Sequence, residues 1–256
     1  MNSQTSLKNE EILTGEQVEK FKCDGFLVIE NFVDAPSLEV YHHVYREICI
    51  NQENPEGITD GNMKTDKRDS NKNKRIMLPA SEYPLLFDMP AHRLSKEMAR
   101  ELMGEEMALE YDMFINKGPQ SGIPTPWHQD SAYCPPIPDM RALTFWLALD
   151  DATIENGCLW MAPGSHKKGT MPHIKNSNGV LECEGSEIMG QAIELKAGSC
   201  VLFDGFTAHY SRGNKSKEHR RVLTTNYRPV DMMNYLGKVT VNHTGERSFQ
   251  DELVMH

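Results

Sequence analysis

Three polar residues of the chain have the types and the spacing needed to hold a metal ion. One residue separates His128 from Asp130, and His209 follows far along the sequence. On a strand, residues i and i+2 point to the same side, so His128 and Asp130 would face a metal together. With His209 arriving from a distant strand they form a 2-His-1-carboxylate facial triad, the ligand set typical of non-haem Fe(II) oxygenases.

A pair of arginines, Arg220 and Arg221, follows His209 at the start of the segment RRVLTTNY. A guanidinium is a planar fork that pairs with a carboxylate. Strand alternation sends the two arginines to opposite faces, so one of them points into the molecule. A buried guanidinium is costly unless it is paired, and the distal carboxylate of 2-oxoglutarate would be such a partner. The pattern indicates an Fe(II)/2-oxoglutarate-dependent oxygenase, but alternation alone does not decide which arginine points inward.

Composition describes an ordinary globular chain. It has 256 residues, of which 39% are hydrophobic and 25% charged, and one domain is the default at this length. The formal net charge of −10 argues against general nucleic-acid binding. No apolar run reaches the roughly 18 residues of a membrane span. We therefore expect a small-molecule substrate and neither a nucleic-acid nor a membrane partner, while the oligomeric state stays unknown.

Cysteine usage and the first residues bear on the cellular compartment. The N-terminal segment lacks the charged and apolar regions of a secretory signal. The six cysteines are scattered and include no C-x-x-C pair. We expect free thiols in a reducing, cytoplasmic environment.

Helical signals come first along the chain, and short strands follow. A flexible tail is expected over residues 1–12, and Thr14 opens a helix through a capping box with Gln17. Further helices are expected over 34–48 and 91–103, and strands over 26–29, 107–115, 141–149, 158–162, 192–195, 199–203 and 220–227. This order predicts a mainly β protein with an N-terminal helical layer, in which residues 13–256 form one domain. Residues 51–75 are almost free of apolar side chains, which predicts a mobile loop or lid.

Three stretches resemble the phytanoyl-CoA dioxygenase family. They are INKGPQSGIPTPWHQDSAY, FWLALDDATIENGCLWMAPGSHKKG and LKAGSCVLFDGFTAHYSRGNKSKEHRRVLTTNYRP. Residues 14–230 are covered, and the chain is similar in particular to the phytanoyl-CoA dioxygenase domain-containing proteins. The resemblance implies a double-stranded β-helix core, a cupin-like jelly roll, that uses Fe(II), with 2-oxoglutarate and O2 as co-substrates.

The resemblance also assigns roles to residues. It implies that His128, Asp130 and His209 are the catalytic metal ligands and that Arg220, not Arg221, binds 2-oxoglutarate. The other co-substrate residues that it implies are Ser211, Gln129, Met113, Trp146 and a basic residue that is either Lys74 or Arg75. For Gln129 the implied role conflicts with strand alternation, and a local twist at the strand end would reconcile the two. The Asn156-Gly157 pair is a hairpin signal, so we expect it to determine the fold rather than the chemistry.

The implied reaction is hydroxylation of an unactivated C–H bond of a small or medium polar metabolite, with release of succinate and CO2. A carboxylate at Asp130 favours hydroxylation, because halogenating relatives have a small residue there. An acyl-CoA substrate of the phytanoyl-CoA type is the alternative. Two alternatives belong to other classes of function. One is a non-catalytic protein that binds metal and 2-oxoglutarate, and the other is a Zn(II) hydrolase. The chain has no H-E-x-x-H motif, which counts against the hydrolase.

Overall fold

The computed structural model describes residues 12–53, 73–104, 107–134, 137–177, 179–232, 239–241 and 247–249. Helices dominate the described residues up to Gly104. They are α1 (Gly15–Asp24), α2 (Ala35–Glu53), α3 (Pro79–Glu82) and α4 (Pro90–Met103). Single 3-10 turns are η1 (Pro84–Asp88), η2 (Asp130–Tyr133) and η3 (Ser165–Lys168). Among the described helices, none combines the length and the apolar character needed to cross a membrane.

Strands make up most of the remaining chain. They are β1 (Phe26–Ile29), β2 (Asn73–Met77), β3 (Met107–Lys117), β4 (Thr125–His128), β5 (Leu143–Ala148), β6 (Leu159–Met161), β7 (His173–Lys175), β8 (Leu181–Cys183), β9 (Gln191–Ile193), β10 (Cys200–Asp204), β11 (His209–Ser211), β12 (Arg220–Pro229), β13 (Val239–Val241) and β14 (Arg247–Phe249). The predicted helices and strands are thus present, with ends shifted by a few residues.

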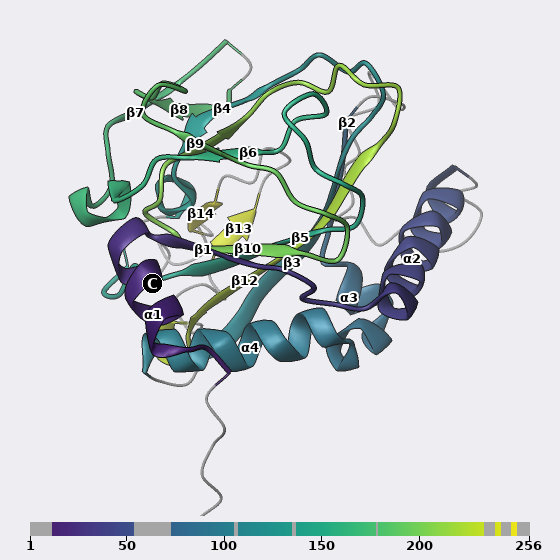
Figure 1. Cartoon of the computed structure of the whole chain (residues 1–256), viewed down its shortest axis with the longest axis horizontal. Helices are drawn as coiled ribbons and strands as arrows, with labels where there is room; N and C mark the ends of the chain where they lie inside the picture. Colours follow the sequence, from purple (N-terminus) through teal and green to yellow (C-terminus); the bar gives the residue numbers. More distant parts are fainter. Residues whose placement is uncertain are drawn as a thin grey trace, which may run out of the picture.

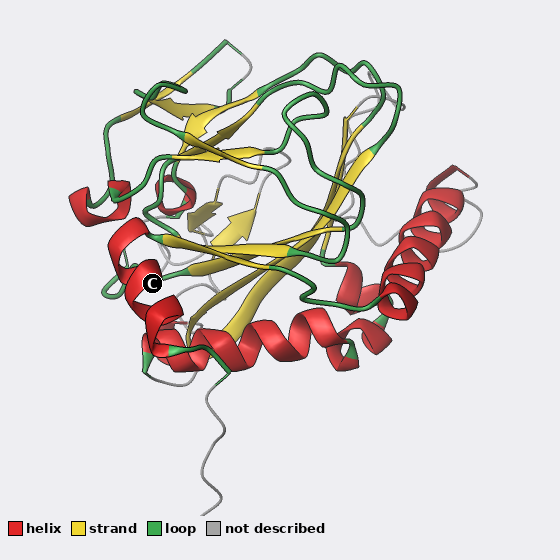
Figure 2. Ribbon diagram, in the orientation of Figure 1, coloured by secondary structure: helices red, strands yellow, loops and turns green. Residues whose placement is uncertain are grey.

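Two antiparallel sheets form the barrel. The large sheet has the order β1-β10-β5-β12-β3-β2, and the small sheet has the order β4-β11-β6-β9. Helices α1, α3 and α4 lie along the side of the large sheet that faces away from the small one (Figures 1 and 2). This is the predicted jelly roll with a helical layer on one side.

Each face of the large sheet buries its own set of apolar side chains. One set packs against the helices and includes Phe145, Leu147 and Leu223. The other lies between the sheets and includes Trp146 and Val222. Since β5 is buried along its whole length, its alternation separates two cores rather than a core from solvent. The strands β5 and β12, which carry Trp146 and Arg220, are therefore packed on both faces.

Local signals set the first elements as predicted. The Thr14 hydroxyl accepts from the backbone N–H of Gln17, and the Gln17 side chain accepts from the N–H of Thr14. The helix ends at Gly25, whose φ of 83° is a left-handed conformation that glycine adopts without a steric penalty. Phe21 is buried and packs the inner face of α1 against the core.

Two predicted flexible segments differ from the expectation at their ends. Helix α2 continues to Glu53 and β2 already begins at Asn73, so both ends of the predicted 51–75 loop are regular structure. The N–H groups of Ile12 and Leu13 donate to the Glu101 carboxylate at 2.9 and 3.1 Å, which holds the end of the predicted tail to α4. Residues 1–11 and 54–72 lie outside the described residues.

Candidate active site

The three predicted metal ligands converge between the sheets. His128 at the end of β4 lies opposite His209 at the start of β11 in the strand register. The Nε2 atoms of His128 and His209 lie 3.8 and 3.6 Å from Oδ1 of Asp130. One donor atom from each residue lies within 4.8 Å of the others, which is close enough for one ion to bind all three.

Backbone carbonyls fix the orientation of both imidazoles. The Nδ1 of His128 is 2.8 Å from the Pro126 carbonyl, and the Nδ1 of His209 is 2.9 Å from the Thr207 carbonyl. A carbonyl only accepts, so each Nδ1 carries the proton and each Nε2 keeps a lone pair for a metal. Burial, with the nearby His209 ring, holds the pKa of His128 well below its usual value. His128 is therefore neutral at pH 7, as metal binding requires.

Asp130 reaches the site from a different element than predicted. Strand β4 ends at His128, and Asp130 is the first residue of η2. Gln129 between them remains extended, with φ −119° and ψ 137°, so residues i and i+2 still face the same side. The strand-based prediction is wrong for the element, but its conclusion about facing holds.

Gln129 points away from the triad. Its side chain is fully buried, and its Nε2 donates to the carbonyls of Gly169 and Phe206 at 2.9 and 2.5 Å. Its Oε1 accepts from the N–H of Met171 at 2.6 Å. Both N–H bonds of the amide are used, so the residue ties the metal-site turn to two neighbouring loops. Strand alternation gave the right facing, and these hydrogen bonds give Gln129 a structural role; its role in binding 2-oxoglutarate stays a prediction that they do not support.

The two arginines of β12 separate as alternation requires. Arg221 forms a two-point pair with Asp150, with both N–O distances 2.8 Å. Arg220 is 2% exposed and lies over the Trp146 ring, 5.2 Å from its centroid. Among the described residues, no carboxylate pairs with Arg220, and its Nε has no hydrogen-bond partner. Burial lowers the pKa of Arg220 to about 10, so the group is still a cation at pH 7.

Strand register places Lys74 and Arg75 on opposite faces of the large sheet. Arg75 lies opposite Ile115, which lies opposite Val222, and Val222 belongs to the core between the sheets. Residues directly opposite in neighbouring strands share a face. Arg75 therefore faces the barrel interior with Arg220, whereas Lys74 faces the helical side.

The remaining predicted residues lie on this interior. Trp146 and Met113 are both opposite Thr224 of β12, and Trp146 packs in the core between the sheets. Ser211 is buried two residues after His209 on β11, on the same side of that strand. The predicted site residues other than Gln129 and Lys74 thus face the barrel interior.

The Asn156-Gly157 pair is structural, as predicted, but the hairpin signal is wrong, because the flanking strands β5 and β6 belong to different sheets. The Asn156 side chain accepts from the N–H of Thr153 at 2.7 Å and donates to the Asp151 carbonyl at 2.7 Å. These bonds close the loop between β5 and β6 and give the amide a structural role.

Comparison with known proteins identifies the family. The family described as "Phytanoyl-CoA dioxygenase (PhyH)" matches residues 21–222, which is most of the chain. The chain belongs to the phytanoyl-CoA dioxygenase family. It is accordingly an Fe(II)/2-oxoglutarate-dependent oxygenase with a His-Asp-His site.

Similar proteins agree over nearly the whole length. Human "Phytanoyl-CoA dioxygenase, peroxisomal" is 26% identical over 267 residues, covering 95% of this chain and 75% of the relative. "Phytanoyl-CoA dioxygenase" of Arabidopsis thaliana is 28% identical and covers 83% and 87%. The crystal structure of EvdO2 from Micromonospora carbonacea var. aurantiaca, complexed with 2-oxoglutarate, superposes with a TM-score of 0.74 at 26% identity. The superposition covers 85% of this chain and 91% of the EvdO2 chain.

This member of the phytanoyl-CoA dioxygenase family holds its site through residues that the sequence did not single out. Thr144 donates to the Asp130 carboxylate at 2.8 Å. Lys117 is 3% exposed and donates to the carbonyls of Ile123 and Arg212 at 3.2 and 2.8 Å, next to Ser211. Burial is the first cause that holds the pKa of Lys117 well below its usual value, and Arg220 is the second. For Thr144 the available signal was a polar residue in the otherwise apolar strand β5.

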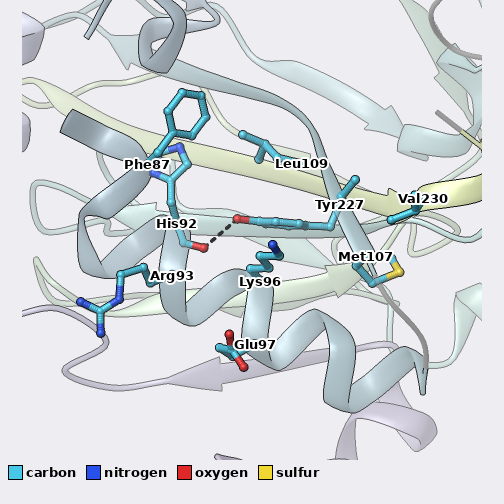
Figure 3. Close-up of a pocket in the computed structure, with 10 residues that line it drawn as sticks. Phe87, His92, Arg93, Lys96, Glu97, Met107, Leu109, Tyr227 and Val230 are labelled. Atoms are coloured by element: carbon cyan, nitrogen blue, oxygen red, sulfur yellow. Dashed lines mark hydrogen bonds between the residues drawn. The ribbon is translucent and has the colours of Figure 1, made fainter. Parts of the chain in front are cut away.

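A separate cavity of about 430 Å³ lies on the helical side of the large sheet. Residues of α4 and of β3 and β12 line it, and the Tyr227 hydroxyl donates to the His92 carbonyl at its floor (Figure 3). The cavity contains none of the predicted site residues, so it is distinct from the metal site.

Proposed function

We propose that this oxygenase hydroxylates an unactivated C–H bond of a small or medium polar metabolite, with release of succinate and CO2. One observation carries the proposal. Arg220 is a buried guanidinium without a carboxylate partner among the described residues, and it shares the barrel interior with the His-Asp-His cluster. A buried cation of this kind is costly unless an anion lies beside it. The far carboxylate of 2-oxoglutarate supplies that anion.

Nearby arginines make the contrast clear. Arg212 pairs with Glu187, Arg221 with Asp150, and Arg228 with Glu110. Arg220 alone of the four has no such partner among the described residues. Its position therefore fits a site for a ligand rather than a structural ion pair.

Each residue has a role in the proposal. His128, Asp130 and His209 hold Fe(II) through two Nε2 atoms and one carboxylate oxygen, a donor set that fits this metal. The bound metal supplies O2 activation coupled to decarboxylation of 2-oxoglutarate. Arg220 binds the distal carboxylate and thereby orients the co-substrate. Ser211, Met113, Trp146 and Arg75 complete the pocket, and Arg75 is preferred to Lys74 because it faces inward.

Net charge and the named relatives bear on the substrate class. A net charge of −10 makes a large anionic ligand less favourable, which supports a small or medium polar molecule. An acyl-CoA substrate is the alternative, supported by relatives named phytanoyl-CoA dioxygenase. A protein that binds the same ligands without turnover is a further alternative. Its ligand set would be the same, so the turnover screen described below separates the two.

Cellular location and domain organisation are also proposals. All six cysteines are free, which supports a reducing compartment, and we propose the cytoplasm. The human relative is named peroxisomal, so localisation of a fluorescent fusion is the appropriate test. We propose that residues 13–256 form one domain.

Two measurements test the proposed function. Anaerobic addition of Fe(II) and 2-oxoglutarate to the metal-free protein is expected to produce a visible charge-transfer band. A metabolite panel that includes acyl-CoA thioesters is then screened for substrate-stimulated succinate release. A missing band would contradict the proposed site. A band with no turnover across the panel would favour the non-catalytic alternative.

A further inference from the structure

Two polar side chains of the large sheet form a hydrogen-bonded relay to the metal-site carboxylate. Thr144 Oγ1 is 2.8 Å from Oδ2 of Asp130, and Asn226 Nδ2 is 2.8 Å from Thr144 Oγ1. An ionised carboxylate only accepts, so the single proton of the Thr144 hydroxyl points to Asp130. The hydroxyl then accepts from Asn226, which requires the amide N–H on that side. The direction of the relay is therefore fixed.

The relay residues lie where stability alone would favour apolar side chains. Thr144 is 3% exposed and Asn226 is 1% exposed, and the two lie opposite each other on β5 and β12. The Oδ1 of Asn226 is buried and has no hydrogen-bond partner among the described residues. A buried acceptor without a partner is costly. The N–H group of the Asn226 amide is therefore the part that makes an interaction at this position.

The two carboxylate oxygens of Asp130 make different interactions. Oδ2 accepts from Thr144, while Oδ1 is the oxygen near Nε2 of both His128 and His209. Without Thr144, the carboxylate would be free to rotate about its side-chain torsions. A fixed carboxylate loses less conformational freedom when the ion binds.

We propose that Thr144 and Asn226 are positioning residues that hold Asp130 with the single oxygen Oδ1 turned to the metal. Asn226 acts through Thr144. This inference rests on the proposed function, because it takes the triad as the metal site. Partners of this kind are typically responsible for roughly 10- to 100-fold in metal affinity.

The test measures metal affinity rather than turnover, with Mn(II) as a redox-stable probe detected by the EPR signal of the free ion. Thr144→Val keeps the shape and removes the hydroxyl, and we expect Mn(II) binding roughly 10- to 100-fold weaker. Thr144→Ser restores the hydroxyl and is expected to restore affinity. Asn226→Leu is expected to weaken binding less than Thr144→Val.

Thr225→Val is the matched control. Thr225 is a buried threonine beside Asn226, but it lies opposite Phe145 on the helical face of the sheet. Removal of the Thr225 hydroxyl is expected to leave the affinity for Mn(II) unchanged. Adding Asn226→Leu to Thr144→Val should cause little further loss, because a relay is already broken at its first link.

Several outcomes would overturn the relay. Mn(II) affinity equal to wild type in folded Thr144→Val would do so, as would equal, additive losses from the two substitutions. If Thr144→Val does not fold by circular dichroism, unchanged affinity in folded Asn226→Leu overturns the role of Asn226. Wild-type protein that binds no Mn(II) would overturn the proposed function as well. Wild-type binding with unaffected variants overturns the relay alone.

Discussion

At the scale of single residues, the site depends on which polar groups already have partners. The neighbouring side chains of Arg220 and Arg221 differ by one step of alternation, yet one is paired with Asp150 and the other lies buried over Trp146. The imidazoles of His128 and His209 show the same logic, because each uses Nδ1 on a carbonyl and keeps Nε2. The atoms available to bind a ligand are the ones that have no hydrogen-bond partner among the described residues: Nε2 of the two imidazoles and the guanidinium of Arg220.

Arg220→Ala is expected to raise the concentration of 2-oxoglutarate needed for half-saturation far more than Arg221→Ala does. Loss of a charge-assisted and largely desolvated pair costs on the order of 2–5 kcal/mol. Titration of the charge-transfer band of the Fe(II) protein gives the two dissociation constants. A larger effect from Arg221→Ala would contradict the assignment.

Substitution of any one metal ligand should remove activity while the fold survives. His128→Ala, Asp130→Ala and His209→Ala each delete a donor that projects into the site between the sheets. Succinate release is expected to fall to background, with an unchanged far-ultraviolet circular dichroism spectrum. Wild-type-like succinate release by one variant would exclude that residue from the triad.

At the scale of elements, close loop crossings fix the strand ends that carry the site. Gly157 has φ +94°, and an added Cβ would lie 2.5 Å from the Arg212 carbonyl oxygen and 3.2 Å from Lys117 Cδ. Lys117 in turn donates to that same carbonyl. The loop before β6 and the loop after β11 therefore meet at a point where no side chain fits.

Gly157→Ala is expected to destabilise the protein by roughly 2–4 kcal/mol, because left-handed backbone strain adds to the clash with backbone. Gly104→Ala is the matched control, since Gly104 also has positive φ, at +69°, but an added Cβ would have no atom of the described residues within 4 Å. Its cost should be limited to the strain. Urea unfolding compares the two, and equal losses would show that the crossing contributes nothing.

Asp204 at the end of β10 predicts a pH-dependent stability. Burial raises the pKa of its carboxyl above the ordinary 3.8, although Oδ1 accepts from the N–H of Phe206. Between the two pKa values the folded state binds more protons than the unfolded state, so this group's contribution falls as pH rises. Asp204→Asn should therefore raise the melting temperature at pH 7. The gain should shrink as pH falls towards 3.8; a gain independent of pH would contradict burial as the cause.

At the scale of the whole molecule, the site joins the two sheets. The small sheet contributes His128 and His209, and the large sheet contributes Arg220 and Thr144. Ligands that contact both sheets bind only the folded state, so they stabilise the barrel as a unit.

Mn(II) with 2-oxoglutarate is expected to raise the melting temperature by roughly 5–10 °C. Saturation at 100 times the dissociation constant contributes about 2.7 kcal/mol, and each kcal/mol shifts the midpoint of a protein of this size by about 2–4 °C. Excess EDTA should reverse the shift, as followed by differential scanning fluorimetry. Asp130→Ala should show no metal-dependent shift, and an equal shift in this variant would place the metal elsewhere.

Local pattern determined much of this protein. Capping residues set α1, and hydrophobic runs predicted the strands. The spacing of His128, Asp130 and His209 indicated a metal site, because side-chain facing over a few residues follows from backbone geometry alone. The alternation that turns Gln129 away from its neighbours could also be read locally.

Tertiary structure decided what depends on partners far apart in sequence. Alternation separates Arg220 from Arg221 and Lys74 from Arg75, but only strand register shows which face is enclosed by the second sheet. The element carrying Asp130 and the relay through Thr144 and Asn226 were likewise set by distant contacts. A periodic pattern fixes the relative orientation of neighbours, whereas burial of a face and satisfaction of its polar groups are properties of the assembled sheets.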